Sequence, residues 1–312
     1  MKQDAGLDPE KTGAARERPS IEFIKTLAWV FVFLALFFGV AVGTHLGGLA
    51  IGYTTFGWLS PVVRVVIEIG GVLLITWLVR VKLNKKGWTG MALPRPQVAR
   101  LLFGCCCGIL TILAVFWIEY MLGWAHVTRI STEHLLGLPR PVLILFELLP
   151  ALGTGFGEEL AFRGYIFQTL GERVPVWVAA LMMGVIFALA HFTLHGFGIS
   201  FVLSTIGGSV MFLVLRFATG SLWFPIGFHA MWDWTQTFLV GFSGAGTAHD
   251  PALIQISQGG PPFWVGGGAV DESGILFMLA WGLVLILALA YGKHVGRTPP
   301  WTRRLSADGR TF

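Results

Sequence analysis

The chain has 312 residues, of which 54% are hydrophobic and only 12% charged, about half the charged fraction of a typical soluble domain. Its mean hydropathy of +0.71 indicates an integral membrane protein, without room for a second sizeable soluble domain, because each span uses about 20 residues. The net charge of +5 does not indicate nucleic-acid binding, because the basic residues gather at the ends of apolar segments.

In chain order, residues 1–22 mix both charge signs and contain two prolines, so we expect a disordered cytoplasmic tail rather than a signal peptide. The apolar stretches that follow predict about eight transmembrane helices. They lie at 23–44, 59–79, 98–123, 141–170, 175–194, 199–217, 222–240 and 274–293. The predicted fold class is therefore all-α, a polytopic membrane helical bundle over 23–294, followed by a basic tail at 295–312.

Basic residues predict the orientation of these spans. They gather in the second connection, after the fourth span, at the end of the sixth span (Arg216) and in the C-terminal tail. The connections 45–58 and 241–273 contain no lysine or arginine. The positive-inside rule therefore predicts that both termini are cytoplasmic, and we expect a bacterial plasma membrane. We expect the Gly-rich segment 241–273 to be a long flexible outer loop.

Three short motifs place six ionisable side chains inside or beside the fourth, fifth and seventh spans. GEELAFRG contains Glu158, Glu159 and Arg163, FALAH ends in His191, and HAMWD contains His229 and Asp233. A charged group at mid-membrane costs about 2.5 to 3.5 kcal/mol on insertion scales. Several such groups together predict a polar chamber within the bundle, where they have partners.

The spacing of these residues along each helix indicates which of them can interact. Glu159 and Arg163 are four residues apart, so they share a helix face and can form an ion pair. Glu158 lies about 100° round the helix, and a carboxylate left free there can take a proton from water and return it. His229 and Asp233 also share a face, so the carboxylate can orient the imidazole or both can bind one ion.

Each motif by itself has a plainer interpretation. Glu159 and Arg163 would form a structural ion pair near the interface, and His191 would be a buried histidine bonded to a carbonyl. Outside the motifs, Arg64 and Glu68 predict another local ion pair, and we expect Glu119 to reach the interface at the outer end of the third span. The occurrence of all three motifs in one chain is the stronger signal.

Together the motifs resemble those of the CPBP family of intramembrane proteases, which includes the type II CAAX prenyl endopeptidases and bacterial bacteriocin-processing or immunity proteins. The family pattern EExxxR matches Glu158, Glu159 and Arg163, FxxxH matches Phe187 and His191, and HxxxN or HxxxD matches His229 and Asp233. The match covers about residues 140–240, which the resemblance makes the protease core. It implies a bundle of about eight spans that cleaves peptide bonds at a membrane-embedded site.

The resemblance also implies roles for the site residues. Glu158 would be the base that activates water, with His191 helping to hold or deprotonate that water. His229 and Asp233 would bind the developing oxyanion or orient its donor, and the pair of Glu159 and Arg163 would fix the geometry. The substrate implied is a hydrophobic or prenylated peptide or protein in contact with the lipid bilayer.

The cofactor is left open by the same resemblance, because enzymes of this type have been called both metalloproteases and glutamate-dependent proteases. His191, His229 and a carboxylate are the ligand types for one Zn2+ with a water in the fourth position. Metal-free acid–base chemistry fits the same residues equally well.

Two other functions fit the buried charges. An ion- or proton-coupled transporter would also need carboxylates and histidines in the membrane, although no repeat relates two halves of the chain. A non-catalytic immunity or scaffold protein of the same fold is the second alternative.

The depths of the two histidines create a difficulty for any shared site. Counted from the cytoplasmic ends at 1.5 Å per residue, His191 lies about 22 Å deep and His229 about 10 Å deep. For the two side chains to meet, the fifth span must start later or the seventh must begin with a broken or tilted turn. Pro225 and Gly227 could supply such a break.

Overall fold

The computed structural model describes residues 19–56, 60–132, 134–135, 138–195, 199–242, 252–266 and 274–306. Most of the expected N-terminal tail, part of the 241–273 segment and the end of the C-terminal tail lie outside these ranges. Helix α1 begins at Pro19, before the expected start of the first span at residue 23.

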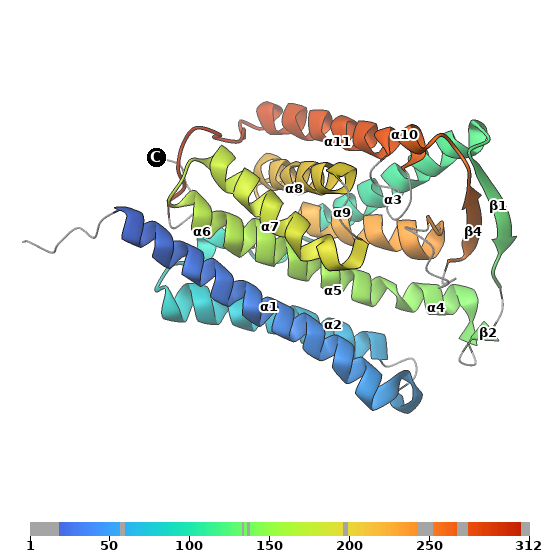
Figure 1. Cartoon of the computed structure of the whole chain (residues 1–312), viewed down its shortest axis with the longest axis horizontal. Coiled ribbons are helices and arrows are strands. Elements are labelled where there is room, and N and C mark those ends of the chain that lie inside the picture. Colours follow the sequence, from blue (N-terminus) through green and yellow to red (C-terminus); the bar gives the residue numbers. More distant parts are fainter. Residues whose placement is uncertain are drawn as a thin grey trace, which may run out of the picture.

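Helices make up most of the described chain (Figure 1). They are α1 (Pro19–Phe56), α2 (Ser60–Thr76), η3 (Trp77–Leu83), η4 (Trp88–Met91), α3 (Val98–Met121), α4 (Arg140–Phe146), α5 (Leu148–Glu158), η5 (Glu159–Ile166), α6 (Phe167–Gly171), α7 (Val176–His195), α8 (Ile199–Thr219), α9 (Trp223–Trp234), η6 (Thr235–Leu239), α10 (Pro262–Val265) and α11 (Ile275–His294). The short strands are β1 (Ala125–Ile130), β2 (His134–Leu135), β3 (Leu138–Pro139) and β4 (Ile254–Gln258). Segments η3, η5 and η6 are π-helical and continue the helices before them.

All eight segments expected to span the membrane are helical. Within the described part of the chain, six helical runs are long and apolar enough to cross a membrane: Ser20–Thr44, Pro61–Leu83, Val98–Met121, Arg140–Gly171, Ile199–Thr219 and Ile275–His294. Within α7, Val176–His191 is apolar but shorter, and α9 with η6 provides the remaining segment. The predicted fold class, a polytopic helical membrane bundle, is confirmed.

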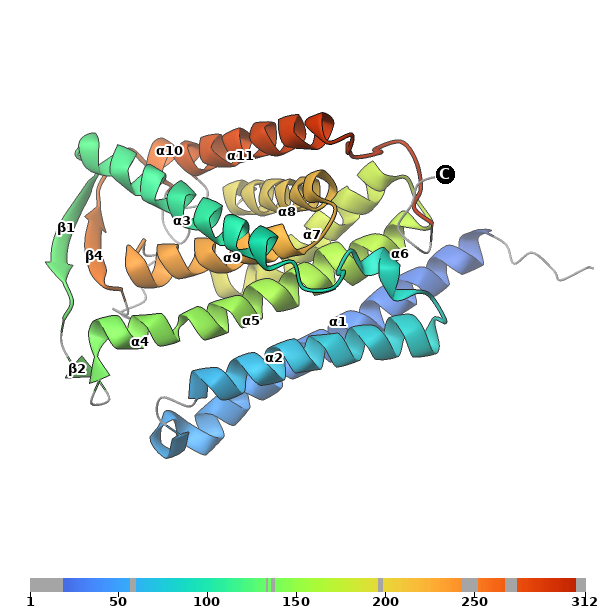
Figure 2. The ribbon, with the colours of Figure 1, turned by 180° about the vertical axis from the view of Figure 1, so that it is seen from behind.

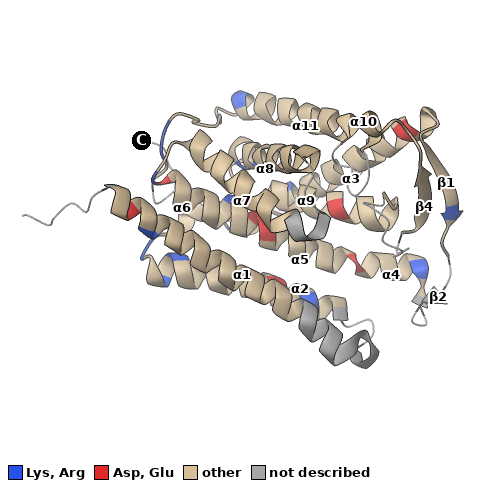
Figure 3. Ribbon diagram, viewed as in Figure 1, with Lys and Arg blue, Asp and Glu red and all other residues tan. Residues whose placement is uncertain are grey.

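The continuous run of α5, η5 and α6 lies inside the bundle, between the α1–α2 pair on one side and α7, α8 and α9 on the other (Figures 1 and 2). Helix α3 lies along α9, and α11 lies along α8. Lys and Arg gather toward the end of the bundle that carries the C-terminal segment, whereas Asp and Glu are spread along the bundle and also occur within α5 and α9 (Figure 3).

Glycines bring the backbones of α3 and α9 into direct contact. A Cβ atom added at Gly108 of α3 would lie 2.5 Å from the Phe228 carbonyl oxygen, and one at Gly227 of α9 would lie 2.2 Å from that of Leu101. Small residues at such positions allow helices to pack closely in a membrane, where apolar side chains alone give little driving force.

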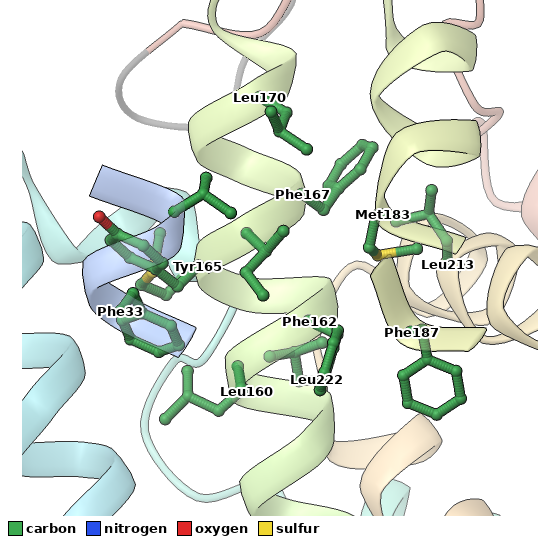
Figure 4. Close-up of a cluster of buried hydrophobic side chains, with 14 of the residues drawn as sticks. Phe33, Leu160, Phe162, Tyr165, Phe167, Leu170, Met183, Phe187, Leu213 and Leu222 are labelled. Carbon is green, nitrogen blue, oxygen red and sulfur yellow. The ribbon is translucent and has the colours of Figure 1, made fainter. Parts of the chain in front are cut away.

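A large apolar cluster surrounds the π-helical segment η5. Leu160, Phe162 and Tyr165 are fully buried. Phe33 of α1 stacks on Tyr165 with ring centroids 4.1 Å apart, and Phe162 meets Phe187 of α7 edge-on (Figure 4). The helix run that contains the first motif is therefore fixed from both sides.

The connection 241–273 contains more structure than the sequence predicted. Its segment β4 pairs antiparallel with β1, and Pro262–Val265 forms a helical turn. Glu119 of α3 is fully buried and accepts a hydrogen bond from Gln258 Nε2 at 2.7 Å. The expectation that Glu119 reaches the interface is therefore wrong, because β4 lies over it.

The C-terminal segment also packs back on the bundle in its described part. The Trp177 and Val176 amides donate to the carbonyls of Trp301 and Arg303, at 3.1 and 2.9 Å, and the Leu305 amide donates to that of Gly171 at 2.7 Å. We name residues 297–306 the C-terminal strap. The strap covers the ends of α6 and α7.

Candidate active site

The first motif lies where α5 passes into the π-helical segment η5. Glu158 ends α5 and Glu159 begins η5. Arg163 Nη1 lies 2.9 Å from Glu159 Oε1, and both side chains are fully buried. The ion pair expected from the four-residue spacing is present. A single π-helical turn within an α-helix is often found at functional sites.

Two aromatic rings hold the Arg163 guanidinium. Its carbon atom lies 4.4 Å from the ring centroid of Phe187 in α7 and 4.9 Å from that of Phe212 in α8. Phe187 is the first residue of the second motif, whereas Phe212 belongs to no motif and was not singled out from the sequence. A buried cation over aromatic faces gains about 2 kcal/mol or more when it is desolvated.

The third motif reaches the same carboxylate from α9. His229 Nδ1 lies 3.0 Å from Glu159 Oε1. The other ring nitrogen, Nε2, lies 3.5 Å from Asp233 Oδ2 and 3.8 Å from Glu158 Oε2. A histidine whose Nδ1 is held by a carboxylate has its ring orientation and tautomer fixed.

His191 of the second motif faces the same point from α7. Its Nδ1 lies 2.9 Å from the Phe187 carbonyl oxygen, and its Nε2 lies 3.9 Å from Glu158 Oε2. The plain interpretation of His191 as a histidine bonded to a carbonyl is therefore correct, and the same bond directs Nε2 toward Glu158.

Glu158 Oε2 is thus the point at which two imidazoles from different helices converge. The atom is buried and accepts no hydrogen bond from the described protein groups. Exposure rises across the cluster, from 0% for Glu159 and Arg163 to 18% for Glu158, 23% for His191 and 38% for Asp233. The structure therefore brings the six residues of the three motifs together, with an inner closed side and an outer accessible side.

The break that Pro225 and Gly227 could have supplied in the seventh span is absent. Helix α9 runs without interruption through Pro225 and Gly227. It begins nearer the centre of the bundle than α7 does (Figure 2). The turn before α9 is covered by the 88–97 segment, because the Leu222 amide donates to the Ala92 carbonyl at 2.8 Å and Trp223 Nε1 to the Pro94 carbonyl at 3.1 Å. Counting both histidines from one common membrane surface therefore underestimated the depth of His229.

The chemistry of the two histidines suits a metal. Each imidazole has Nδ1 on an oxygen acceptor and Nε2 toward the site, as metal-binding histidines usually do. Within the described ranges, however, no three His, Cys, Asp or Glu side chains are grouped closely enough to hold an ion.

Comparison with known proteins bears on the part of the chain that holds all three motifs. Residues 140–235 match the family model described as type II CAAX prenyl endopeptidase Rce1-like. Over this segment the chain is similar to that family. The resemblance to the CPBP family is thereby confirmed for this segment, which runs from α4 into η6. No curated protein and no solved structure matches the chain.

The description of the matched family names an endopeptidase, so the similarity favours a protease, and a CAAX family implies a membrane-associated peptide substrate and a lipid environment. With the long apolar helices, it supports an integral membrane protein. The match does not distinguish a metalloprotease from a glutamate-dependent one. It therefore leaves the mechanism to the chemistry of the side chains.

Proposed function

We propose that this protein is an intramembrane endopeptidase that hydrolyses a peptide bond of a hydrophobic or lipidated membrane-associated substrate. The observation that carries the proposal is the convergence of His191 Nε2 and His229 Nε2 on Glu158 Oε2, at 3.9 and 3.8 Å. These separations exceed a direct hydrogen bond, and a water molecule is the proposed bridge between Glu158 and the two imidazoles.

In the proposed reaction, Glu158 is the general base. It takes a proton from the water, whose oxygen attacks the carbonyl carbon of the scissile peptide bond. A carboxylate positioned within one hydrogen bond of the water satisfies the geometric requirement for general base catalysis, which typically contributes about 10²- to 10⁴-fold in rate. His191 holds the water through Nε2, because its Nδ1 is bonded to the Phe187 carbonyl.

Attack by water turns the substrate carbonyl into an oxyanion, for which His229 is the proposed donor. Glu159 occupies Nδ1 of His229, so Nε2 is the nitrogen available to the oxyanion. Three carboxylates, those of Glu158, Glu159 and Asp233, lie within 3.8 Å of this imidazole and hold it in place. A preorganised donor of this kind stabilises charge that develops in the transition state.

Collapse of the tetrahedral intermediate completes the reaction. Glu158 returns its proton to the leaving nitrogen, the carbon–nitrogen bond breaks, and the products are an amine and a carboxylic acid, which gives its proton to the amine or to water. Glu159 and Arg163 take no part in proton transfer in this scheme. Their role is to hold His229, because Glu159 Oε1 contacts both Arg163 and the imidazole.

The proposed substrate reaches the site from the side of Asp233, the most exposed of the six residues. A hydrophobic or prenylated peptide suits this position, because the site lies in a bundle whose outer surface is apolar over α1, α3 and α11. Both termini would be cytoplasmic, because lysines and arginines gather at the end of the bundle that carries the C-terminal segment.

Zinc is a second proposal for the same site, which rests on the two directed Nε2 atoms. When bound, the ion would be held by His191, His229 and Glu158, and it would act as a Lewis acid toward water or the carbonyl. Metal analysis of the purified protein tests this. A zinc site gives about one metal per chain in the wild type, which is lost in His191→Ala and His229→Ala.

The test of the main proposal uses purified protein in detergent micelles and two reporter peptides, one farnesylated at a C-terminal cysteine and one an unmodified transmembrane peptide. The wild type should cleave at least one of them, and Glu158→Gln should lose cleavage. Glu68→Gln is the matched control, because Glu68 is a membrane-embedded carboxylate paired with Arg64 at 2.8 Å on α2, outside the three motifs.

Two results would contradict the proposed protease. Unchanged cleavage by Glu158→Gln would show that Glu158 is not the general base. Ion or proton flux in liposomes that depends on Glu158, without cleavage of either peptide, would instead identify a transporter.

A further inference from the structure

Arg216 is a second fully enclosed arginine near the site, and it belongs to none of the three motifs. It lies near the C-terminal end of α8 with 5% of its surface exposed. From the sequence alone, Arg216 is interpreted as one of the basic residues that mark the cytoplasmic end of a span. A residue in that role would extend its charge to water, whereas the Arg216 guanidinium points into the bundle.

The contacts of Arg216 are with oxygens of the neighbouring chain segments. Nη1 donates to the Arg163 carbonyl. Nη2 donates to the Gly90 carbonyl at 2.9 Å and to Gln168 Oε1 at 3.5 Å. Among the described residues no carboxylate forms an ion pair with Arg216. A buried cation without a counterion destabilises the folded state. The hydrogen bonds of Arg216 must therefore offset this cost.

The Arg163 carbonyl is the acceptor that explains this arrangement. In an α-helix this carbonyl would accept from the Phe167 amide, four residues later. Because η5 is π-helical, the Phe167 amide donates instead to the carbonyls of Phe162 and Gly164. The π-helical turn thus takes away the α-helical donor of the Arg163 carbonyl, and Arg216 supplies another one.

We infer that Arg216 is a positioning residue for the active site, acting through the main chain of Arg163. A continuous set of contacts carries this effect. Arg216 holds the Arg163 carbonyl, the Arg163 side chain holds Glu159 at 2.9 Å, and Glu159 holds His229 at 3.0 Å. The bond to Gly90 ties the same guanidinium to η4, so that η5 cannot slide relative to this end of the bundle.

The activity part of this inference rests on the proposed endopeptidase function, but the positional part does not. The test therefore has two measurements on the same full-length variants in micelles. Arg216→Lys keeps the positive charge but cannot reach three acceptors with a planar fork. Arg80→Lys is the matched control, because Arg80 is also fully buried and donates to Gly87 and Glu172, outside η5.

The first measurement is the kinetics of reporter-peptide cleavage. Arg216→Lys should lower kcat by about 10- to 100-fold, the usual effect of removing a residue that orients a site from outside. KM should change little, because no substrate contact is removed. Arg80→Lys should retain kcat.

The second measurement is nitrogen-15 NMR of the imidazole groups, with the His229 signals assigned by their loss in His229→Gln. Arg216→Lys should displace the His229 Nδ1 signal, because the hydrogen bond from Glu159 is disturbed. Arg80→Lys should leave that signal in place. This result is informative even if neither peptide is cleaved, so it separates failure of this inference from failure of the proposed function.

The inference is overturned by any of three results. One is an unchanged His229 signal in folded Arg216→Lys. Another is an equal displacement in Arg80→Lys, which would indicate a general effect of loosening this end of the bundle. The third is loss of the folded peak in size-exclusion chromatography for Arg216→Lys but not for Arg80→Lys, which would make Arg216 a residue of folding alone.

Discussion

His229 Nδ1 lies 3.0 Å from Glu159 Oε1, the same oxygen that accepts a hydrogen bond from Arg163. One carboxylate oxygen therefore joins α9 to the helix run of the first motif. The local ion pair that four-residue spacing predicts is thus also the anchor for a histidine from a distant part of the chain. Because Glu159 binds both Arg163 and His229, it has a structural role that the adjacent Glu158 does not share.

Glu159→Gln should reduce stability, whereas Glu158→Gln should not. Loss of the Glu159 charge leaves Arg163 buried without its partner, and we expect the free energy of unfolding in micelles to fall by about 3 to 5 kcal/mol. Glu158 Oε2 accepts no hydrogen bond from the described groups, so Glu158→Gln should unfold as the wild type does while losing cleavage. Equal unfolding free energies for the two variants would show that the glutamates do not divide their roles in this way.

Asp233→Asn should retain much of the activity, and Asp233→Leu should not. Asp233 Oδ2 lies 3.5 Å from His229 Nε2, at the exposed side of the site. Asparagine keeps an oxygen at this position, as in the HxxxN form of the family motif, whereas leucine removes it. We expect initial cleavage rates to fall by less than about 10-fold for asparagine and by about 100-fold for leucine. Similar rates for both variants would mean that Asp233 does not orient His229.

Gly104→Ala should destabilise the bundle and displace α9. The added Cβ would lie 2.1 Å from the Phe224 carbonyl oxygen, so the backbones of α3 and α9 would have to separate. Overpacking of this kind costs about 1 to 3 kcal/mol, which thermal unfolding in micelles measures. Gly207→Ala in α8 is the control, because nothing lies within 4 Å of the added atom. A lower unfolding temperature for Gly207→Ala than for Gly104→Ala would contradict the close approach of α3 and α9.

Glu172, which follows α6, should make stability depend on pH in the acid range. Burial raises its pKa, but hydrogen bonds and charge from Arg80 and Lys86 outweigh burial, so the pKa is lowered from its ordinary value of 4.5. A lowered pKa in the folded state means that Glu172 stabilises the protein above about pH 4.5, and that this contribution is lost as the pH falls through the folded-state pKa.

Comparison of Glu172→Gln with the wild type tests this pH dependence. The variant should unfold at a lower temperature than the wild type at pH 7, and the difference should shrink as the pH is lowered below 4.5. A difference that grows toward acid pH would reverse the sign and refute the ion pairs with Arg80 and Lys86.

Much of the fold could be predicted from local sequence because the bilayer imposes a simple rule. An apolar stretch of about 20 residues must satisfy its backbone hydrogen bonds internally, so it forms a helix. Each of the eight expected segments is accordingly helical. The pairing of β1 with β4 was missed, because its partners are more than a hundred residues apart and the Gly-rich flanks of β4 are typical of a loop.

The relative depth of the helices could not be predicted in the same way. Counting from the ends of spans assumes that every helix begins at the same level, and the 88–97 segment over the start of α9 breaks that assumption. Neither Phe212 nor Arg216 was assigned a place at the site, because the importance of each depends on contacts with Arg163 of another helix.

By itself, the sequence determined which segments form helices and which six side chains are too polar to face lipid, because both follow from the cost of leaving polar groups in hydrocarbon. Only the tertiary structure decided that two imidazoles meet at one oxygen of Glu158. That meeting depends on the level at which each helix starts and on how closely glycines let the backbones approach, and both are fixed by contacts between residues far apart in the chain.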